Sequence, residues 1–369
     1  MRMTQLKTIA DIQTGPFGSQ LHKEDYVETG TPIVTVEHLG NRVFTEQNLP
    51  RVSDSDKARL IKYTLSTGDI VFSRVGSVDR CSYVDKSHDG WMFSGRCLRV
   101  RPTELVDSLY LYYYFCLEET KQFVRNIAVG ATMPSINTKL LGEVEIALPD
   151  LNNQKRIAAV LSSLDDKIEN NQKLNDNLQQ QAQAIYSSMF IDNPDPAWSH
   201  GHLSDLITVK YGKDHKKLAD GIYPVYGSGG IMRYVERPLY NKESVLIPRK
   251  GTLNNVMYVN QPFWSVDTMF YTEMKLPNVA KFVYHFVKAK DLASMNAGSA
   301  VPSMTTDILN AMEVVIPSAS ALEEFESLVA PMYEAMEAND VQSKALSQIR
   351  DTLLPKLMSG EIDVSDVQL

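Results

Sequence analysis

The chain has 369 residues, of which 43% are hydrophobic, and carries a formal net charge of −8. This length and composition predict two or three domains with ordinary soluble cores. The sequence has no apolar signal core and no run near about 18 apolar residues, so we expect neither export nor a membrane span, and a cytoplasmic protein. Its three cysteines form no CxxC pattern, which argues against a zinc site or a disulfide framework.

The negative charge is concentrated in two segments of the chain. Residues 150–200 and 318–369 have net charges of −3 and −7. Residues 1–149 and 201–317 have net charges of −1 and +3. A negative total therefore does not exclude nucleic-acid binding, because the two longer segments leave room for local basic faces.

Residues 1–149 predict a mixed domain in which short strands alternate with Gly, Pro and Asp turns. Residues 108–124 have apolar side chains at helical spacing and predict one packed helix. A helical turn is expected at 138–141. The predicted strands are residues 31–36, 69–73, 81–84, 98–100 and 144–148.

Residues 150–192 predict a long helix, because the stretch from Leu151 to Phe190 contains neither proline nor glycine. Its apolar residues alternate at spacings of three and four, which makes a narrow seam typical of a coiled coil. Forty helical residues would be about 60 Å long. The prolines at 194 and 196 end this helix. The seam residues are Ile157, Leu161, Leu164, Ile168, Leu178, Ile185 and Met189.

The second half of the chain repeats this organisation. Residues 197–317 predict another mixed domain, with a counterpart of the tyrosine-rich helix within residues 277–295. Residues 318–360 predict a second long helix. The predicted strands are residues 207–209, 222–226, 244–247, 256–259 and 269–272.

An offset of 168 residues relates the two halves without a gap over both a motif and a helix. GATMPSINTKLLGEVEIALP at residues 130–149 aligns with GSAVPSMTTDILNAMEVVIP at residues 298–317. The same offset places the seam of the first long helix on apolar residues of the second, for example Ile157 on Phe325. The chain is therefore a tandem duplication, and the two helices are the natural partners for each other's seams.

Motifs that would indicate catalysis are missing or incomplete. Asn193-Pro194-Asp195-Pro196 lacks the second proline and the aromatic residue of the amino-methyltransferase tetrapeptide, so we interpret it as a linker. The glycine-rich residues 221–230 have no Gly-Lys-Ser/Thr ending of a P-loop, and no HExxH is present. We expect no catalytic residue and no metal site in this chain.

Several stretches resemble the specificity (S) subunits of type I restriction–modification systems. They are QTGPFGSQL at residues 13–21, GDIVFSR at 68–74, LPDL at 148–151 with QKRI at 154–157, and YPVYGSGG at 223–230. The resemblance implies an α+β fold: two mixed α/β target-recognition domains joined by two long antiparallel helices that form a coiled coil, with an internal pseudo-twofold repeat. The second helix departs from it, since Pro317-Ser318-Ala319-Ser320 replaces the first repeat's Pro149-Asp150-Leu151-Asn152.

The resemblance also implies a function. Each target-recognition domain would recognise one half of a bipartite site in double-stranded DNA, asymmetric because the domains differ, and the coiled coil would set the spacer between the halves. Two methyltransferase (M) subunits would dock on the helices, and restriction/translocase (R) subunits would join them. The chain itself would need no cofactor, because S-adenosylmethionine, ATP and Mg²⁺ would belong to the partner subunits.

DNA contacts are expected from basic and amide side chains near strand ends, because phosphates favour Lys and Arg while base edges also favour Asn, Gln and Ser. GDIVFSR at 68–74 and ESVLIPR at 243–249 both end in an arginine, and that recurrence strengthens the prediction for these two loops. Arg99 and Arg101 follow Arg96 at a spacing that points them partly to different faces. The Gly15–Ser19 loop is equally well explained as a fold-defining turn. The predicted DNA-binding residues are Ser19, Gln20, Lys23, Arg74, Arg80, Arg96, Lys213, His215, Lys216, Lys217, Arg249, Lys250, Asn254 and Asn255.

Two other interpretations remain open at this point. One is the specificity subunit of a related system in which the cleavage and methylation subunits are fused. The other is a coiled-coil scaffold that does not contact DNA, which the acidic helices fit but the basic clusters fit less well.

Asn171 and Asn339 are equivalent polar residues within the two seams, and such residues fix the register of a coiled coil at a cost in stability. We therefore expect the double substitution Asn171→Leu and Asn339→Leu to stabilise the helix pair and loosen its register. Denaturant unfolding and the spacer length of the recognised DNA site measure the two effects. Unchanged unfolding together with an unchanged spacer would contradict this role.

Overall fold

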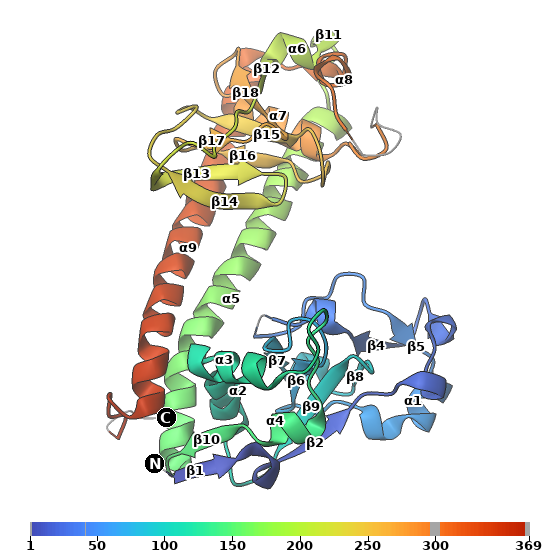
Figure 1. Cartoon of the computed structure of the whole chain (residues 1–369). Coiled ribbons are helices and arrows are strands. Elements are labelled where there is room, and N and C mark those ends of the chain that lie inside the picture. The colour runs from blue at the N-terminus through green and yellow to red at the C-terminus, as the bar shows by residue number, and fades with distance from the viewer. Residues whose placement is uncertain (1, 41, 296–302, 366–369) are drawn as a thin grey trace. The chain divides into compact units, whose positions relative to one another are not determined.

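The structure, a computed structural model, describes residues 2–40, 42–295 and 303–365. The chain divides into two compact units: unit 1 comprises residues 1–171 and 341–369, and unit 2 comprises residues 172–340. Each unit contains one mixed α/β domain and one segment of each of two long helices (Figure 1). The predicted α+β fold with an internal repeat is confirmed.

Unit 1 contains two four-stranded sheets, ordered β2-β9-β6-β7 and β3-β5-β4-β8, and the pair β1-β10. The first sheet is antiparallel throughout, and β4 and β8 are parallel neighbours in the second. The strands are β1 (Arg2–Gln5), β2 (Ala10–Thr14), β3 (Tyr26–Val27), β4 (Thr31–Val34), β5 (Arg51–Val52), β6 (Ile70–Ser73), β7 (Cys81–Tyr83), β8 (Met92–Phe93), β9 (Cys97–Pro102) and β10 (Glu145–Leu148).

The helices of the unit 1 domain differ from the sequence prediction at one point. The single helix expected over residues 108–124 is wrong, because the chain breaks at Leu117, whose ψ of 133° is extended. Six consecutive residues of the first piece are buried, whereas the second piece is amphipathic and starts with two glutamates that favour a helix N-terminus. The helices are α1 (Asp54–Arg59), α2 (Ser108–Cys116), α3 (Glu118–Ile127) and α4 (Thr138–Gly142).

Unit 2 repeats this plan with sheets β12-β18-β15-β16 and β14-β13-β17 and the pair β11-β19. The parallel pair β13 and β17 corresponds to β4 and β8, and α7 corresponds to α2. The elements are β11 (Ser199–His202), α6 (Leu203–Leu206), β12 (Ile207–Tyr211), β13 (Asp220–Gly227), β14 (Gly230–Val235), β15 (Ser244–Pro248), β16 (Met257–Val259), β17 (Trp264–Ser265), β18 (Met269–Met274), α7 (Ala280–Lys288), α8 (Thr306–Asn310) and β19 (Glu313–Ile316).

The two long helices are α5 (Leu151–Ser187), which is followed by one π-helical turn (Ser188–Asp192), and α9 (Ala319–Ser359). They are antiparallel in each unit, since partner numbers fall along α9 as they rise along α5. In unit 1, Asp165 bonds Arg350 and Asn171 bonds Ser343; in unit 2, Asn175 accepts from Asn339. None of the helices in the described part of the chain combines the length and apolar character needed to cross a membrane.

Apolar residues of both long helices are built into the core of each domain. In unit 1, Ile157 and Leu161 of α5 and Leu357 of α9 join the cluster around Tyr110 and Phe115. In unit 2, Phe325 and Val329 of α9 join Tyr186 of α5 in the cluster around Phe282. The offset of 168 pairs Ile157 with Phe325 and Leu161 with Val329, so equivalent positions are buried in both repeats.

Polar side chains occupy the seam between these apolar ends. Asn171 is buried and donates from Nδ2 to Oε1 of Gln342 at 2.9 Å and to Oγ of Ser343 at 3.1 Å. In unit 2, Asn339 donates to Oδ1 of Asn175 at 2.8 Å. The contact of Asn171 with Ser343 becomes that of Asn339 with Asn175 under the 168-residue offset. The role of Asn171 and Asn339 in register stays a prediction.

A second pair of equivalent contacts joins each domain to its helices with different chemistry. In unit 1 the Tyr113 hydroxyl donates to Oδ2 of Asp165 at 2.7 Å, and Arg350 donates to Oδ1 of the same carboxylate at 2.6 Å. In unit 2 the equivalent contact joins His285 to Tyr333 at 2.9 Å, and Nδ1 of His285 lies 2.8 Å from Oε1 of Gln183. This arrangement fits a neutral imidazole that donates from Nδ1 and accepts at Nε2. Burial lowers the pKa of His285 from 6.5 to about 4.

We expect His285 to make the stability of the protein pH-dependent. Its folded-state pKa is below the unfolded value, so the unfolded chain binds the proton first and stability falls as the pH decreases from about 6.5 to about 4. The loss from this group should be about 3 kcal/mol at most. Denaturant unfolding of wild type and His285→Gln at pH 7.5 and pH 5 measures it. The variant should lose less stability between these pH values, whereas the exposed-site control His200→Gln should behave as wild type.

Candidate nucleic-acid interface

An arginine at the end of a central strand makes the same two contacts in both units. In unit 1, Nη1 of Arg74 donates to the Gly95 carbonyl at 3.0 Å, and the guanidinium lies 5.8 Å from the ring centre of Phe17. In unit 2, Nη1 of Arg249 donates to the Asp267 carbonyl at 3.2 Å, and its guanidinium lies 5.3 Å from the ring centre of Tyr211. We call this arrangement the arginine clasp.

The duplicated Pro-Ser motif packs against the clasp and explains why it is repeated. The amide of Ile136 donates to the Arg74 carbonyl at 2.9 Å, and the amide of Met304 donates to the Arg249 carbonyl at 2.9 Å. Ser135 bridges Val75, and Ser303 bridges Lys250. Both pairs follow the offset of 168, so the motif holds the arginine loop in place in each repeat.

A glycine allows the neighbouring loop to pass close to the clasp. A Cβ added to Gly15 would lie 2.1 Å from the carbonyl oxygen of Ser94, and one added to Gly212 would lie 2.0 Å from that of Val266. Only glycine tolerates such an approach of two backbones. The glycine at the start of the Gly15–Ser19 loop therefore has a fold-defining role, and the loop ends beside the clasp.

The predicted residues of unit 1 lie in different environments. Arg96 is exposed, and its carbonyl accepts from the Arg74 amide at 2.8 Å, so these two residues share one strand end. Lys23 is exposed as well. Gln20 accepts a hydrogen bond from the Tyr63 hydroxyl at 2.6 Å, and Arg80 donates to the Leu39 carbonyl. The Ser19 side chain lies outside the described part of the chain.

The predicted residues of unit 2 separate into an exposed group and an engaged group. Lys213, Lys216, Lys217 and Lys250 are exposed, and Lys213 lies where its amide donates to the Ser265 carbonyl at 2.8 Å. Nδ1 of the half-buried His215 has no hydrogen-bond partner among the described residues.

Asn254 and Asn255 form the engaged group of unit 2. Asn254 donates to Asp291 at 3.0 Å and accepts from the Ala293 amide at 3.0 Å. Asn255 donates to the Ser228 carbonyl at 2.8 Å, which ties it to the turn between β13 and β14. Both side chains therefore shape the loops of this edge.

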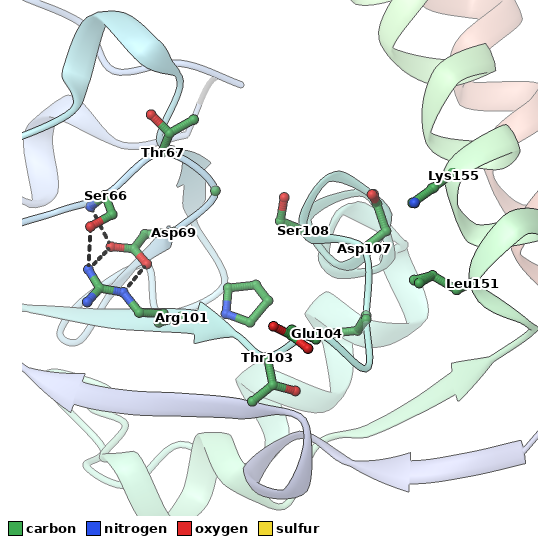
Figure 2. Close-up of a pocket in the computed structure, with 13 residues that line it drawn as sticks. Ser66, Thr67, Asp69, Arg101, Thr103, Glu104, Asp107, Ser108, Leu151 and Lys155 are labelled. Atoms are coloured by element: carbon green, nitrogen blue, oxygen red, sulfur yellow. Dashed lines mark hydrogen bonds and ion pairs between the residues drawn. The ribbon is translucent and has the colours of Figure 1, made fainter. Parts of the chain in front are cut away.

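Two further arginines of unit 1 form ion pairs inside the domain. Arg99 is 4% exposed and binds Asp11 at 2.8 Å. Arg101 binds Asp69, itself 1% exposed, through Nε at 2.8 Å and Nη2 at 2.7 Å. Figure 2 shows this pair beside Ser66 at the rim of a pocket of about 460 Å³. The pocket lies at the start of β6, at the other end of that strand from Arg74, so it is not part of the clasp.

The sequence analysis missed the aromatic residues of the clasp. Phe17 is 60% exposed and Tyr211 is 51% exposed although both are large side chains. Exposed aromatic faces beside cationic groups can stack on bases or sugars. The available signal was an aromatic residue within two positions of Gly15 and within one of Gly212, preceding a basic segment in each half. Among the described residues, no three His, Cys, Asp or Glu side chains cluster as metal ligands.

The chain is similar to known specificity subunits. The family model for the "Type I restriction modification DNA specificity domain" matches residues 1–180 and 197–325. The MjaIX type I restriction enzyme specificity subunit of Methanocaldococcus jannaschii is 27% identical over 72% of this chain and 72% of its own length. The HindI specificity subunit of Haemophilus influenzae is 21% identical over 82% and 88%. The crystal structure of the type I restriction–modification S subunit of M. genitalium has a TM-score of 0.62 at 19% identity and covers 96% of this chain and 95% of its own.

The clasp should stabilise the loop edge of its domain independently of any ligand. Arg74→Met keeps the aliphatic stem but removes the donor to Gly95, so we expect a loss of about 1–2 kcal/mol in unfolding free energy. Amide hydrogen exchange in residues 15–20 and 95–97 should become faster. Arg96→Met, which changes an exposed neighbour of equal charge, is the control and should leave exchange in these segments unchanged. Equal exchange in wild type and Arg74→Met would exclude this structural role.

Proposed function

The chain belongs to the family of type I restriction–modification DNA specificity domains, and from this we propose that it is the DNA-recognition subunit of such a complex. Each α/β domain recognises one half of a bipartite, asymmetric site. The two long helices fix the length of the spacer between the halves. The observation that carries the proposal is the arginine clasp, because the same backbone-held loop edge occurs in both repeats.

The residues around the two clasps differ, which supports recognition of different half-sites. The edge in unit 1 carries Phe17 and Arg96, whereas the edge in unit 2 carries Tyr211, Lys213 and Lys250. A bidentate Arg or Asn contact to a base discriminates by about 1–3 kcal/mol, and lysines add phosphate contacts that do not depend on sequence. Two edges with different donors therefore suit an asymmetric site.

The clasp arginines themselves retain donors for DNA. A guanidinium has five N–H donors, and the clasp uses one of them on a carbonyl in each unit. A residue held in this way loses little conformational freedom when it contacts a phosphate or a base. The clasp therefore supports a role for Arg74 and Arg249 as preorganised contacts.

The methylation and cleavage chemistry belongs to partner subunits in this proposal. The chain is non-catalytic and binds no cofactor of its own; S-adenosylmethionine, ATP and Mg²⁺ are bound by the partners. Two methyltransferase subunits dock on the duplicated frame, and restriction/translocase subunits join that core in the cytoplasm. The internal repeat supports two docking positions, because α5 and α9 present equivalent residues in both units.

Methylome sequencing of cells that express the chain with its cognate methyltransferase subunit tests the function directly. We expect one bipartite motif with two unlike halves and an unread spacer of constant length. A contiguous motif, or methylation without sequence preference, would contradict the proposal.

The lysines of unit 2 should act mainly through phosphates. Replacing Lys213, Lys216 and Lys217 with Ala should weaken binding to site-bearing and random duplexes alike. It should also reduce the slope of log K against log salt by up to about 0.9 for each phosphate that is no longer neutralised by a lysine. Fluorescence anisotropy of the complex with its methyltransferase subunit, measured over a salt series, gives both quantities.

A matched control removes the same charge from the other end of the unit 2 domain. Arg237, Lys242 and Lys275 adjoin the ends of β14, β15 and β18 that lie away from the clasp. Replacing these three with Ala should leave the salt slope within error of wild type. Equal effects of the two triple variants would indicate a general charge effect instead of a binding edge.

A further inference from the structure

An arginine of unit 1 fills an acidic site on the first long helix. Arg42 donates from Nη1 to the Ser162 carbonyl at 3.3 Å, binds Asp166 through Nη2, and lies 2.9 Å from Glu169 through Nε. Its side chain is 17% exposed. Burial alone would lower the pKa of this guanidinium, but Asp166 and Glu169 raise it above its usual value. Arg42 is therefore held as a cation against α5.

The corresponding site in unit 2 is an open cavity. The offset of 168 converts Ser162, Asp166 and Glu169 into Ala330, Glu334 and Glu337. All three of these residues line a cavity of about 730 Å³ between the α/β domain of unit 2 and its helices. Neither Glu334 nor Glu337 forms an ion pair with a cation among the residues that the structure describes.

A difference in one connection explains why unit 1 is filled and unit 2 is open. The parallel pairs Ile33 with Met92 and Val225 with Trp264 show that β4 and β13 are equivalent strands. After β4 the chain continues through residues 35–50, which carry Arg42 and place its carbonyl 2.7 Å from the amide of Tyr83. After β13 the chain turns back at once through Ser228 and Gly229 into β14. Unit 2 thus has no segment equivalent to the one that carries Arg42.

The charge of the cavity determines what it can hold. Six carboxylates line it, and the single lysine, Lys281, is engaged with Glu326 at 2.5 Å and Glu243 at 3.3 Å. DNA is repelled by such a surface. Residues 1, 41, 296–302 and 366–369 contain no lysine or arginine, so this chain's undescribed residues supply no basic side chain for it. The volume is larger than one guanidinium group and within the range of pockets that hold ligands of peptide-fragment size.

We propose that this cavity binds an arginine side chain presented by a methyltransferase subunit, at the position that Arg42 of this chain occupies in unit 1. The inference rests on the proposed function, and it adds the chemistry by which one partner is recognised. A guanidinium suits the site because its fork of donors binds two carboxylates and a carbonyl at once, as Arg42 does. The two repeats then differ: one position is closed by the chain itself and the other is available to a partner.

The test is a charge reversal in the cavity. The double variant Glu334→Lys with Glu337→Lys should bind the purified cognate methyltransferase subunit at least about tenfold more weakly than the wild-type full-length chain, measured by biolayer interferometry. The uncharged pair Glu334→Gln with Glu337→Gln should show a smaller loss in the same direction. Both glutamates are exposed, so folding should be kept, and thermal unfolding of each variant confirms it.

The matched control is Glu323→Lys with Glu324→Lys. These residues are exposed on α9, have the same charge, and do not line the cavity. The control should bind the methyltransferase subunit within about twofold of wild type. Equal weakening in the control and cavity variants would overturn the inference, because it would show a general effect of charge.

A charge swap identifies the partner residue. Each arginine of the methyltransferase subunit is changed to glutamate and tested against the Glu334→Lys, Glu337→Lys chain. One such variant should restore binding, and restoration by none would overturn the inference. If the wild-type chain does not bind the methyltransferase subunit, the proposed function fails. If wild type and the cavity variant bind equally well, only the cavity inference fails.

Discussion

The structure depends on a helix pair whose ends are apolar and whose middle is polar. At each end, side chains from α5 and α9 are part of a domain core, so neither α/β domain is complete without both helices. In the middle, buried Asn171, Asn175 and Asp165 are held by hydrogen bonds from or to the opposite helix. A one-residue slip would leave these groups buried without partners, which costs more than a small defect in apolar packing. The apolar ends supply affinity between the helices, and the polar middle selects one register.

The duplication allowed much of this fold to be predicted from sequence. The offset of 168 placed Ile157 on Phe325 and Leu161 on Val329, and all four are buried. The repeated Pro-Ser motif was visible as an identity, but its purpose was not, because its contact with Arg74 and Arg249 forms between segments far apart in sequence. Local pattern identifies the repeat, whereas tertiary structure explains it.

The site was less predictable for a specific physical reason. Arginines that pair inside a domain and arginines that face solvent have the same sequence pattern. Arg99 and Arg101 differ from Arg96 only because Asp11 and Asp69 lie opposite them. The break at Leu117 was hidden in the same way, since residues 108–124 keep helical spacing on both sides of an extended residue. In each case the deciding interaction involves a partner that spacing along the chain does not reveal.

The composition of the two units has a consequence for biosynthesis. Unit 2 is a continuous segment of the chain, whereas the core of unit 1 needs Leu354, Leu357 and Met358 from near the carboxyl end. Domains fold as units while the ribosome elongates the chain. The first domain to be translated is therefore the last to be completed. Until the final helix leaves the ribosome, the face of the nascent chain that will receive it stays uncovered, so the order of assembly runs opposite to the order of translation.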